Sequence, residues 1–374
     1  MVTLHAHNFK ALRSLRWPLD RGIVVLTGAN GAGKTTTLLA LRVLRDALDR
    51  GLAEAVSLML GGSYNLRHHD APEDDPIELG LDVDDLSWRV RLIPRGPSVA
   101  PVGNETLRQG GVVIFEREAS NNFTYAGAPE RSPAGDRIGL EWAAALHPDD
   151  ARVARVVNLL RSIRVSYDPD LRGLREGGSR VSEDRQLHPR GHNVVAMLRK
   201  WRDRREDRPR FDFVDQGLRS AFPGVYDGLD FDTAGQTVTA SIYRPGDDTP
   251  NPISDEANGV LAMLVHLAQV ASGDEGGIVA IDEPETSLHP YAIRRFVEHT
   301  REWAQRRNLT VILPTHSPVL LDELNAEPDR VFVLERGDSP VPARLDTMRD
   351  RAWLSSYTLG ELYVGGEFAA NEKV

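Results

Sequence analysis

A short segment near the N-terminus combines the residue types that hold a chain of phosphates. Residues 28–35 read Gly-Ala-Asn-Gly-Ala-Gly-Lys-Thr and fit the pattern G-x-x-x-x-G-K-[ST]. Glycine lets the backbone curl until several N–H groups surround phosphate oxygens, and a following helix adds its N-terminal dipole. We therefore predict that a nucleoside triphosphate binds here. The contributing residues are Gly28, Ala29, Asn30, Gly31, Ala32, Gly33, Lys34, Thr35 and Thr36.

Two side chains of this segment carry the expected charge and metal chemistry. We predict that Lys34 contacts the β- and γ-phosphates and that the Thr35 hydroxyl is a ligand of Mg²⁺. The alternative is a chance glycine-rich turn. An apolar strand expected over residues 22–27 and an amphipathic helix expected over 35–50 favour the phosphate site, because the motif requires both neighbours.

Two carboxylates follow an apolar run in the C-terminal half of the chain. The run is Ile278–Ile281, and Asp282 and Glu283 come directly after it. A buried parallel strand delivers the residues at its C-terminal end to the ligand crevice. We predict that Asp282 holds the Mg²⁺ hydration shell and that Glu283 polarises the attacking water. The alternative is a pair of solvated surface acids, and the sequence PETSLHP over residues 284–290 argues against it.

His316 lies two residues after the end of a third apolar strand, which is expected over Leu309–Pro314. At such a place the His316 imidazole is able to hydrogen-bond the γ-phosphate and to respond to its loss. A lone histidine after a strand is more often without function. The order of the three segments along the chain favours the catalytic interpretation, so Lys34, Glu283 and His316 are the predicted catalytic residues.

The segments that position these residues are expected to form both strands and helices, according to their apolar periodicity. Short β-like runs between residues 77 and 126, separated by Asp, Gly and Pro, predict an antiparallel meander. An amphipathic helix is expected over 153–163 and a flexible loop over 168–191. Further helices are expected over 192–205, 213–222, 259–271 and 291–306, a β-hairpin over 229–243, and strands over 277–281, 309–314 and 330–335.

Composition describes a globular protein with an uneven charge distribution. Of the 374 residues, 41% are hydrophobic and 27% are charged, and the formal net charge is −10. No apolar run approaches the roughly 20 residues that span a bilayer, and the N-terminus does not resemble a secretory signal. The absence of cysteine excludes disulfides and thiolate metal sites. We expect a cytoplasmic protein that makes no membrane contact.

Residues 151–219 are basic within this acidic chain. They contain 17 Lys and Arg against 10 Asp and Glu, a balance of +7 that leaves −17 for the remainder. A basic segment on an acidic protein is able to contact a phosphate backbone. The alternative is a solvated, arginine-rich helical surface. DNA contact through 151–219 is therefore one hypothesis of two.

The three segments together resemble the ABC-type ATPases of the RecF/SMC/OLD group. The resemblance rests on GANGAGKT, IVAIDEPETSLHP and ILPTHSP in this order, and it extends to HNFKAL near the N-terminus and to LGELY and GGEF near the C-terminus. It is closest to AAA-family ATP-binding proteins found as DNA-repair-like and phage-defence ATPases. It is strongest over residues 1–45 and 253–320.

This resemblance implies an α/β fold of the P-loop NTPase class with ATP and Mg²⁺ as ligands. The expected architecture is an ABC-type two-lobed head with an antiparallel β-subdomain and an inserted helical lobe. Residues 1–148 and 228–374 would form the head, and 149–227 the lobe. Ser287 would lie in the D-loop and His316 would be the switch histidine. Such heads usually act as homodimers that enclose two ATP molecules, each contacted by the partner's signature helix.

The signature segment departs from the family pattern, which places Ser-x-Gly at the start of that helix. Alignment on glycine gives Ala257–Gly259 and loses the serine, whereas alignment on Ser254 puts Glu256 at the glycine position. We prefer the first, because a helix is expected from Gly259. Asn258 and Gly259 are then expected to face a γ-phosphate in trans. The missing hydroxyl removes one charge-assisted hydrogen bond, worth about 1.5–3 kcal/mol.

A Q-loop glutamine cannot be assigned from the sequence. His68 and His69 lie in the region where that loop is expected, and no role is assigned to them.

Three functions fit these features. The first is an ATP-hydrolysing motor or switch that acts on DNA or on a DNA-acting partner. The second is a low-turnover, ATP-gated dimerisation module that controls a separate effector nuclease or toxin. The third, the ATPase subunit of a transporter, is disfavoured because residues 285–290 differ from the usual transporter D-loop. The chain ends soon after His316, so we expect no TOPRIM nuclease domain within it and assign any DNA cleavage to a partner.

Overall fold

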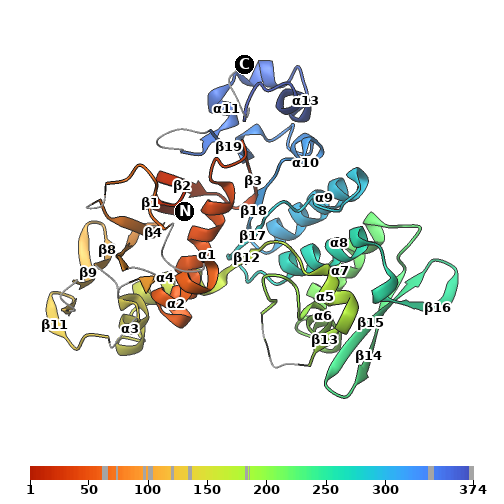
Figure 1. The fold of residues 1–374 in the computed structure, drawn as a ribbon, viewed down its shortest axis with the longest axis horizontal. Coiled ribbons are helices and arrows are strands. Elements are labelled where there is room, and N and C mark those ends of the chain that lie inside the picture. Colours follow the sequence, from red (N-terminus) through yellow and green to blue (C-terminus); the bar gives the residue numbers. More distant parts are fainter. Residues whose placement is uncertain are drawn as a thin grey trace.

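The structure is a computed structural model, and it describes every residue except 61–65, 73–74, 96–97, 100–103, 119–121, 134–136, 182–183, 185, 336–340 and 370–374. A six-stranded sheet in the order β12-β17-β18-β3-β19-β20 forms its centre (Figure 1). These strands are β12 (Ile163–Ser166), β17 (Ile278–Ile281), β18 (Thr310–Pro314), β3 (Gly22–Gly28), β19 (Val331–Leu334) and β20 (Ala343–Arg344). The first five are parallel, so their carboxyl ends lie along one edge.

Strands β3, β17, β18 and β19 are apolar on both faces because other elements cover both sides of the sheet. In β3, Val24 and Leu26 point into one hydrophobic core, whereas Ile23 and Val25 point into the other. Successive side chains of a strand alternate between faces, so a strand buried on both faces reads as a continuous apolar run. This explains why the strand runs found from the sequence have no polar alternation.

An eight-stranded antiparallel sheet covers the first face, in the order β11-β10-β9-β8-β5-β4-β1-β2. Its strands are β1 (Val2–Phe9), β2 (Leu12–Leu19), β4 (Ile77–Val83), β5 (Leu86–Leu92), β8 (Glu105–Gln109), β9 (Val112–Arg117), β10 (Phe123–Tyr125) and β11 (Ala128–Glu130). A separate short pair joins β6 (Pro94–Arg95) to β7 (Ser98–Val99). The two large sheets share one core with helices α1 (Lys34–Arg50), α2 (Leu52–Leu60), α3 (Gly139–Leu146) and α4 (Ala151–Ser162).

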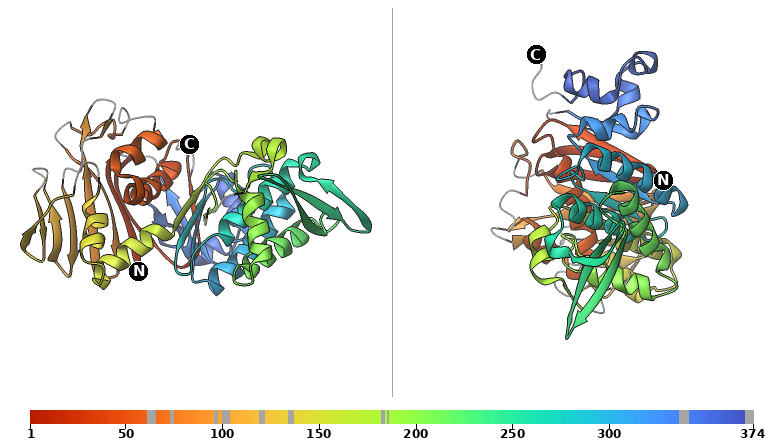
Figure 2. Two further views of the ribbon diagram at one scale, coloured as in Figure 1. Left: turned by 90° about the horizontal axis from the view of Figure 1, so that it is seen from below. Right: turned by 90° about the vertical axis from the view of Figure 1, so that its right-hand side faces the viewer.

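Helices cover the opposite face, and a small sheet packs against some of the neighbouring helices. Helices α8 (Asn258–Ala271) and α9 (Pro290–Arg306) belong to the second core, and α7 (Arg208–Ala221) packs against both of them. The small sheet lies at one end of the molecule and the eight-stranded sheet at the other (Figure 2). The remaining elements there are α5 (Leu171–Gly177), β13 (Ser179–Arg180), α6 (Val194–Asp203), α7 (Arg208–Ala221), β14 (Gly228–Ala234), β15 (Thr237–Arg244), β16 (Asp247–Pro252) and the 3-10 turn Ile253–Asp255.

The C-terminal part forms a cap of short helices beyond β18 and β19 (Figure 1). Helix α10 starts two residues after His316, and α13 packs against it. The cap comprises α10 (Pro318–Asp322), the 3-10 turn Pro328–Arg330, α11 (Leu345–Met348), α12 (Arg351–Leu354) and α13 (Leu359–Val364).

Strand pairing favours limits for the inserted lobe that differ from the predicted 149–227. Residues 149–166 form α4 and β12, and β12 pairs in parallel with β17 in the central sheet. The predicted hairpin over 229–243 lies outside the head, because β15 pairs with β13. Residues 149–166 resemble the lobe residues that follow them in arginine content and amphipathic spacing. Strand pairing, however, assigns them to the head. We therefore propose a lobe of residues 167–257.

Several local predictions also need correction. Strands β2, β8 and β12 and helices α2 and α3 were not predicted, and the segment expected as one flexible loop, 168–191, contains α5 and β13. Most of these elements are short, and the charged residues of β2 and β8 are three positions apart, so their strand periodicity is weak.

Candidate nucleotide site

The glycine-rich segment links the end of β3 to the start of α1. Gly33 is the N-cap of α1 with φ +106°, and Gly31 has φ +78°, backbone angles that L side chains rarely adopt. Gly28 lies beside β19, and a Cβ there would be 2.2 Å from the carbonyl oxygen of Leu334. The tight loop therefore requires glycine at these three positions. Asn30 and Gly31 are exposed at its tip, whereas Ala29, Ala32 and Thr36 are buried.

Lys34 lies folded over this loop with only 7% of its surface exposed. Its Nζ donates hydrogen bonds to the carbonyl oxygens of Gly28, at 2.8 Å, and Ala29, at 3.2 Å. Burial lowers the pKa of Lys34, and the carboxylates of Glu283, Asp282 and Glu285 oppose that shift. The ammonium group is therefore held where a phosphate is able to replace the two carbonyl partners.

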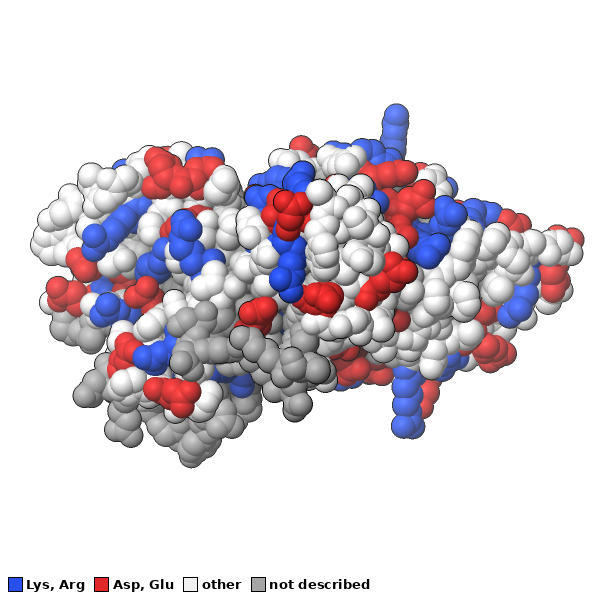
Figure 3. All heavy atoms as spheres, turned by 90° about the horizontal axis from the view of Figure 1, so that it is seen from above, with Lys and Arg blue, Asp and Glu red and all other residues white. Residues whose placement is uncertain are grey.

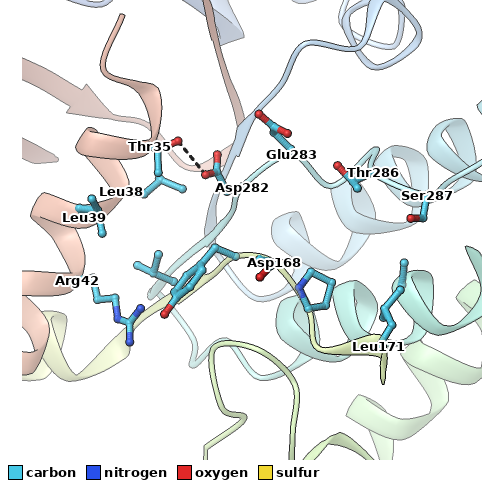
Figure 4. Close-up of a pocket in the computed structure, with 14 residues that line it drawn as sticks. Thr35, Leu38, Leu39, Arg42, Asp168, Leu171, Asp282, Glu283, Thr286 and Ser287 are labelled. Atoms are coloured by element: carbon cyan, nitrogen blue, oxygen red, sulfur yellow. Dashed lines mark hydrogen bonds between the residues drawn. The ribbon is translucent and has the colours of Figure 1, made fainter. Parts of the chain in front are cut away.

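Thr35 and Asp282 meet across the site although they are 247 positions apart in the chain. The Thr35 hydroxyl donates to Oδ2 of Asp282 at 3.0 Å (Figure 4). Burial raises the pKa of Asp282, the hydrogen bond from Thr35 opposes the shift, and the charge of Glu283 adds to it. A hydroxyl and a carboxylate oxygen this close are the oxygen ligands that Mg²⁺ prefers. The donor set thus fits a magnesium ion.

Glu283 is exposed and has φ +45°, an uncommon conformation for a residue other than glycine. Its backbone N–H donates to the carbonyl oxygen of Pro314 at 3.0 Å, which fixes the turn at the strand end. Non-glycine residues with positive φ cost of order 1–3 kcal/mol and are found at active sites and ligand clamps. The turn leaves the carboxylate outside the sheet, beside Asp282 (Figure 4). Ser287, with φ +69°, has the same feature.

His316 follows β18 and is held by two other segments. Its backbone N–H donates to Oε1 of Glu285 at 2.8 Å, and its Nδ1 lies 2.9 Å from the hydroxyl of Tyr363. Burial, followed by the charge of Lys34, lowers the pKa of His316, and the charge of Glu283 opposes this shift. The ring is therefore neutral near pH 7 and lies within the electrostatic reach of both Lys34 and Glu283.

A cavity of about 480 Å³ opens on the lobe side of Asp282. Figure 4 shows its lining, which comes from α1, the end of β12, α8 and the loop after β17. Tyr167 and Asp168, directly after β12, were not predicted as site residues. They reach the cavity because β12 lies next to β17, and that pairing carries no signal in the local sequence. The lining residues are Thr35, Leu38, Leu39, Arg42, Val165, Tyr167, Asp168, Pro169, Leu171, Ala262, Asp282, Glu283, Thr286 and Ser287.

The signature segment borders the same region from α8. Ala257 is the N-cap, so the helix starts at Asn258, one residue earlier than predicted. Arg175 of α5 donates to Oδ1 of Asn258 at 2.7 Å and to the carbonyl oxygen of Ser254 at 2.8 Å. A Cβ on Gly259 would be 3.0 Å from the Ser287 carbonyl oxygen. The predicted Asn258, Gly259 and Ser287 therefore lie together, and Arg175 is an unpredicted neighbour.

The structure thus brings the predicted residues into two neighbouring groups. Lys34, Thr35, Asp282, Glu283 and His316 surround the strand ends, and the signature residues lie with Ser287 across the cavity. By contrast, His68 and His69 are not among the residues that line the cavity.

The basic segment 151–219 does not form one surface. Its first part lies on α4 and β12 and the rest lies in the lobe. Many of its arginines pair with carboxylates, and Figure 3 shows acidic and basic side chains intermixed across one face of the molecule. The paired arginines are Arg152, Arg155, Arg164, Arg172, Arg190, Arg199, Arg202, Arg208, Arg210 and Arg219. The alternative of a solvated surface therefore accounts better for the segment.

Among the helices that the structure describes, none combines the length and the apolar character needed to cross a bilayer.

Sequence comparison identifies a protein family and a relative of the chain. Residues 23–322 match a protein family described as "AAA domain, putative AbiEii toxin, Type IV TA system". The chain is also 24% identical over 390 aligned positions to the OLD nuclease of Thermus scotoductus. That alignment covers 93% of this chain and 66% of the relative, so the chain spans about two thirds of the relative's length.

Structural comparison finds head domains of SMC proteins. One is an SMC head bound to the C-terminal winged-helix domain of ScpA, with TM-score 0.54, 13% identity, and coverage of 93% of this chain and 99% of that one. The other is an SMC head with an extended coiled coil bound to the C-terminal domain of ScpA from Pyrococcus furiosus, with TM-score 0.51, 11% identity, and coverage of 93% and 98%. These similarities confirm the predicted fold class, a P-loop NTPase head of the ABC type.

Proposed function

The chain belongs to the AAA domain family that its sequence matches over residues 23–322, within the RecF/SMC/OLD group of ATPases, and on this premise we propose that it binds ATP with Mg²⁺ and hydrolyses it. The observation that carries the proposal is the contact between Thr35 and Asp282, at 3.0 Å, beside the glycine loop. This contact joins two distant segments of the chain, and a site for a triphosphate with its metal ion would need both of them. The hydrolysis cycle would drive a motor or switch that acts on DNA or on a DNA-acting partner.

The residues divide the chemistry between phosphate holding and water activation. The loop N–H groups and Lys34 would bind the β- and γ-phosphates once Lys34 exchanges its two carbonyl partners for phosphate oxygens. Thr35 and Asp282 would hold Mg²⁺, which when bound neutralises charge on the phosphates. Glu283, exposed beside them, would orient the attacking water and accept its proton. His316 would donate a hydrogen bond to the γ-phosphate from the neighbouring strand end.

Two substitutions separate binding from hydrolysis. Lys34→Ala is expected to weaken ATP binding at least tenfold, because it removes the cation of the loop. Glu283→Gln is expected to keep the dissociation constant for ATP within about threefold and to lower kcat at least a hundredfold, in the range of a lost general base. Isothermal titration and a phosphate-release assay measure the two quantities. Glu302→Gln, at an exposed position of α9, is the matched control and is expected to behave like the wild type. Equal turnover in Glu283→Gln and wild type would remove Glu283 as the base.

A second candidate function is a low-turnover, ATP-gated module that controls a separately encoded effector nuclease or toxin. It is supported by Ala257, which has no hydroxyl to offer where the family places the signature serine. The match to a family described as a toxin and the similarity to a nuclease that extends beyond this chain support an effector as partner. Turnover well below one per minute, together with tight ATP-dependent dimerisation, would favour this module over the motor.

A further inference from the structure

His316, which follows β18, contacts Tyr363 of the C-terminal cap, and Tyr363 has no role in the chemistry proposed above. Nδ1 of His316 lies 2.9 Å from the hydroxyl oxygen of Tyr363, a residue of α13 that is 47 positions further along the chain. Both side chains are half-buried. One ring nitrogen is therefore occupied by this contact, which leaves Nε2 as the only ring nitrogen for a ligand.

Helix α13 is fixed in position by several polar contacts with the segment that follows His316. The backbone N–H of Leu359 donates to Oδ1 of Asn325 at 2.7 Å, and that of Gly360 donates to Oδ1 of Asp322 at 2.8 Å. A Cβ on Gly360 would be 2.7 Å from both Asp322 Oδ1 and the Pro318 carbonyl oxygen, so the two helices are in close contact. A capping box formed by Thr358 and Glu361 closes the first turn. The Tyr363 hydroxyl is therefore presented from a rigid support.

A second contact holds the backbone of the histidine. Oε1 of Glu285 accepts hydrogen bonds from the backbone N–H of His316, at 2.8 Å, and from the Thr315 hydroxyl, at 2.7 Å. Glu285 thus fixes the backbone at His316, whereas Tyr363 contacts only the ring. The two contacts have separable effects, and the orientation of the imidazole depends on Tyr363.

Two arrangements of the protons are compatible with the contact between Tyr363 and His316. Burial raises the pKa of Tyr363, the Thr27 side chain opposes the shift and the Glu285 carboxylate adds to it, so the phenol keeps its proton. Burial and the charge of Lys34 lower the pKa of His316 against the opposing charge of Glu283, so the ring is neutral. A neutral imidazole has one N–H and one lone pair. A phenol hydroxyl both donates and accepts, so either the Tyr363 O–H donates to the Nδ1 lone pair, with the ring proton on Nε2, or Nδ1–H donates to the phenol oxygen. Only the first arrangement leaves an N–H on Nε2, the ring nitrogen that is free for a ligand.

We propose that Tyr363 is a positioning residue, whose hydroxyl holds His316 in the orientation and the Nε2–H tautomer that donate a hydrogen bond to the γ-phosphate of ATP. This inference rests on the proposed ATPase function for the identity of the ligand. The tautomer and its dependence on Tyr363 are properties of the nucleotide-free protein and stand independently of it. The C-terminal cap is thereby part of the hydrolytic machinery, 47 positions away from the histidine in sequence.

Tyr363→Phe removes only the hydroxyl and tests the proposal. We expect kcat for ATP hydrolysis to fall about tenfold and the dissociation constant for ATP to stay within twofold. Tyr357→Phe is the matched control, because Tyr357 is an exposed tyrosine of the same cap, and it is expected to keep wild-type turnover. In a His316→Gln background, Tyr363→Phe is expected to have no further effect on kcat.

Nitrogen-15 NMR of protein labelled at histidine measures the tautomer of His316. This tautomer would not change if Tyr363 only stabilised the fold. The His316 signals, assigned by their loss in His316→Gln, are expected to show the Nε2–H tautomer in wild type and a mixture of tautomers in Tyr363→Phe. An unchanged tautomer in Tyr363→Phe, or an equal fall of kcat with and without His316, would overturn the proposal. If the wild type fails to hydrolyse ATP, the proposed function falls, and the NMR experiment still decides the role of Tyr363.

Discussion

At the scale of single residues, Glu285 accepts the hydrogen bonds that hold the loop carrying His316. Oε1 of Glu285 accepts two hydrogen bonds from the loop that carries His316, whereas Oε2 is buried and makes no hydrogen bond. Burial raises the pKa of Glu285, hydrogen bonds from His316 and Thr315 oppose the shift, and the charge of Glu283 adds to it. The two accepted bonds therefore hold the loop, while the negative charge itself is unfavourable without a ligand.

We predict opposite results for two substitutions of Glu285. In Glu285→Gln the amide oxygen is able to keep both hydrogen bonds and the charge is lost, so the free energy of unfolding is expected to change by less than about 1 kcal/mol. Glu285→Ala leaves two donors without their acceptor and is expected to cost about 2–4 kcal/mol. Denaturant unfolding at pH 7.5 without nucleotide measures both. A loss in Glu285→Gln as large as that in Glu285→Ala would show that the charge, not the acceptor geometry, holds the loop.

At the scale of elements, helix α8 carries the signature segment at its start and a buried histidine in its interior. His266 is 2% exposed, its Nδ1 makes no hydrogen bond, and its ring lies 6.1 Å from that of Phe296. Burial lowers the pKa of His266 to about 4. The pKa of a histidine in the unfolded chain is near 6.5. Between pH 4 and pH 6.5, His266 is therefore mostly protonated in the unfolded chain and mostly neutral in the folded protein.

The stability of α8 is therefore expected to depend on pH in a defined direction. Because the folded state has the lower pKa, the free energy of unfolding falls as pH falls from about 6.5 towards 4. His266 contributes a loss of about 2 kcal/mol between pH 7 and pH 5. His266→Leu is expected to reduce the pH dependence by this amount, as measured by urea unfolding at the two pH values. His69→Leu, at an exposed position, is expected to keep the full dependence. The idea fails if both variants retain the wild-type slope.

At the scale of the whole molecule, the site lies where the head and the lobe face each other. Asp282 and Glu283 come from the central sheet, whereas Asn258 and Gly259 start a helix that packs with the lobe. An α-helix N-terminus favours a negative ligand, and Arg175 adds a positive charge beside it. We propose that two copies dimerise on ATP, so that this helix start faces the partner's γ-phosphate.

Asn258→Asp tests this assembly with a change of one atom. The aspartate is able to keep the hydrogen bond from Arg175, and it places a negative charge where the partner's phosphate would lie. In a Glu283→Gln background, which is expected to retain ATP, light scattering with ATP and Mg²⁺ should report a dimer. Asn258→Asp in that background is expected to weaken dimerisation at least tenfold and to leave ATP affinity within threefold. Dimerisation that is insensitive to Asn258→Asp would exclude this helix start from the interface.

The sequence determined those parts of the protein whose signal is local. Glycines at 28, 31 and 33 are dictated by backbone angles and close contacts, and the apolar runs before Asp282 and His316 are dictated by strands buried on both faces. A short motif therefore predicted the fold class and brought Lys34, Thr35, Asp282, Glu283 and His316 together as candidates. Their catalytic roles remain predictions.

Only the tertiary structure decided which distant segments are neighbours. Tyr167 and Asp168 reach the cavity because β12 pairs with β17, Arg175 reaches Asn258 because α5 packs beside the start of α8, and Tyr363 reaches His316 because α13 packs on α10. Backbone pairing and helix packing depend on elements far apart in the chain, and hydrogen bonds between side chains depend on that packing. The spacing of residues within a short segment does not depend on these contacts. The limits of the lobe and the contact of His316 with Tyr363 could therefore not be predicted from the sequence.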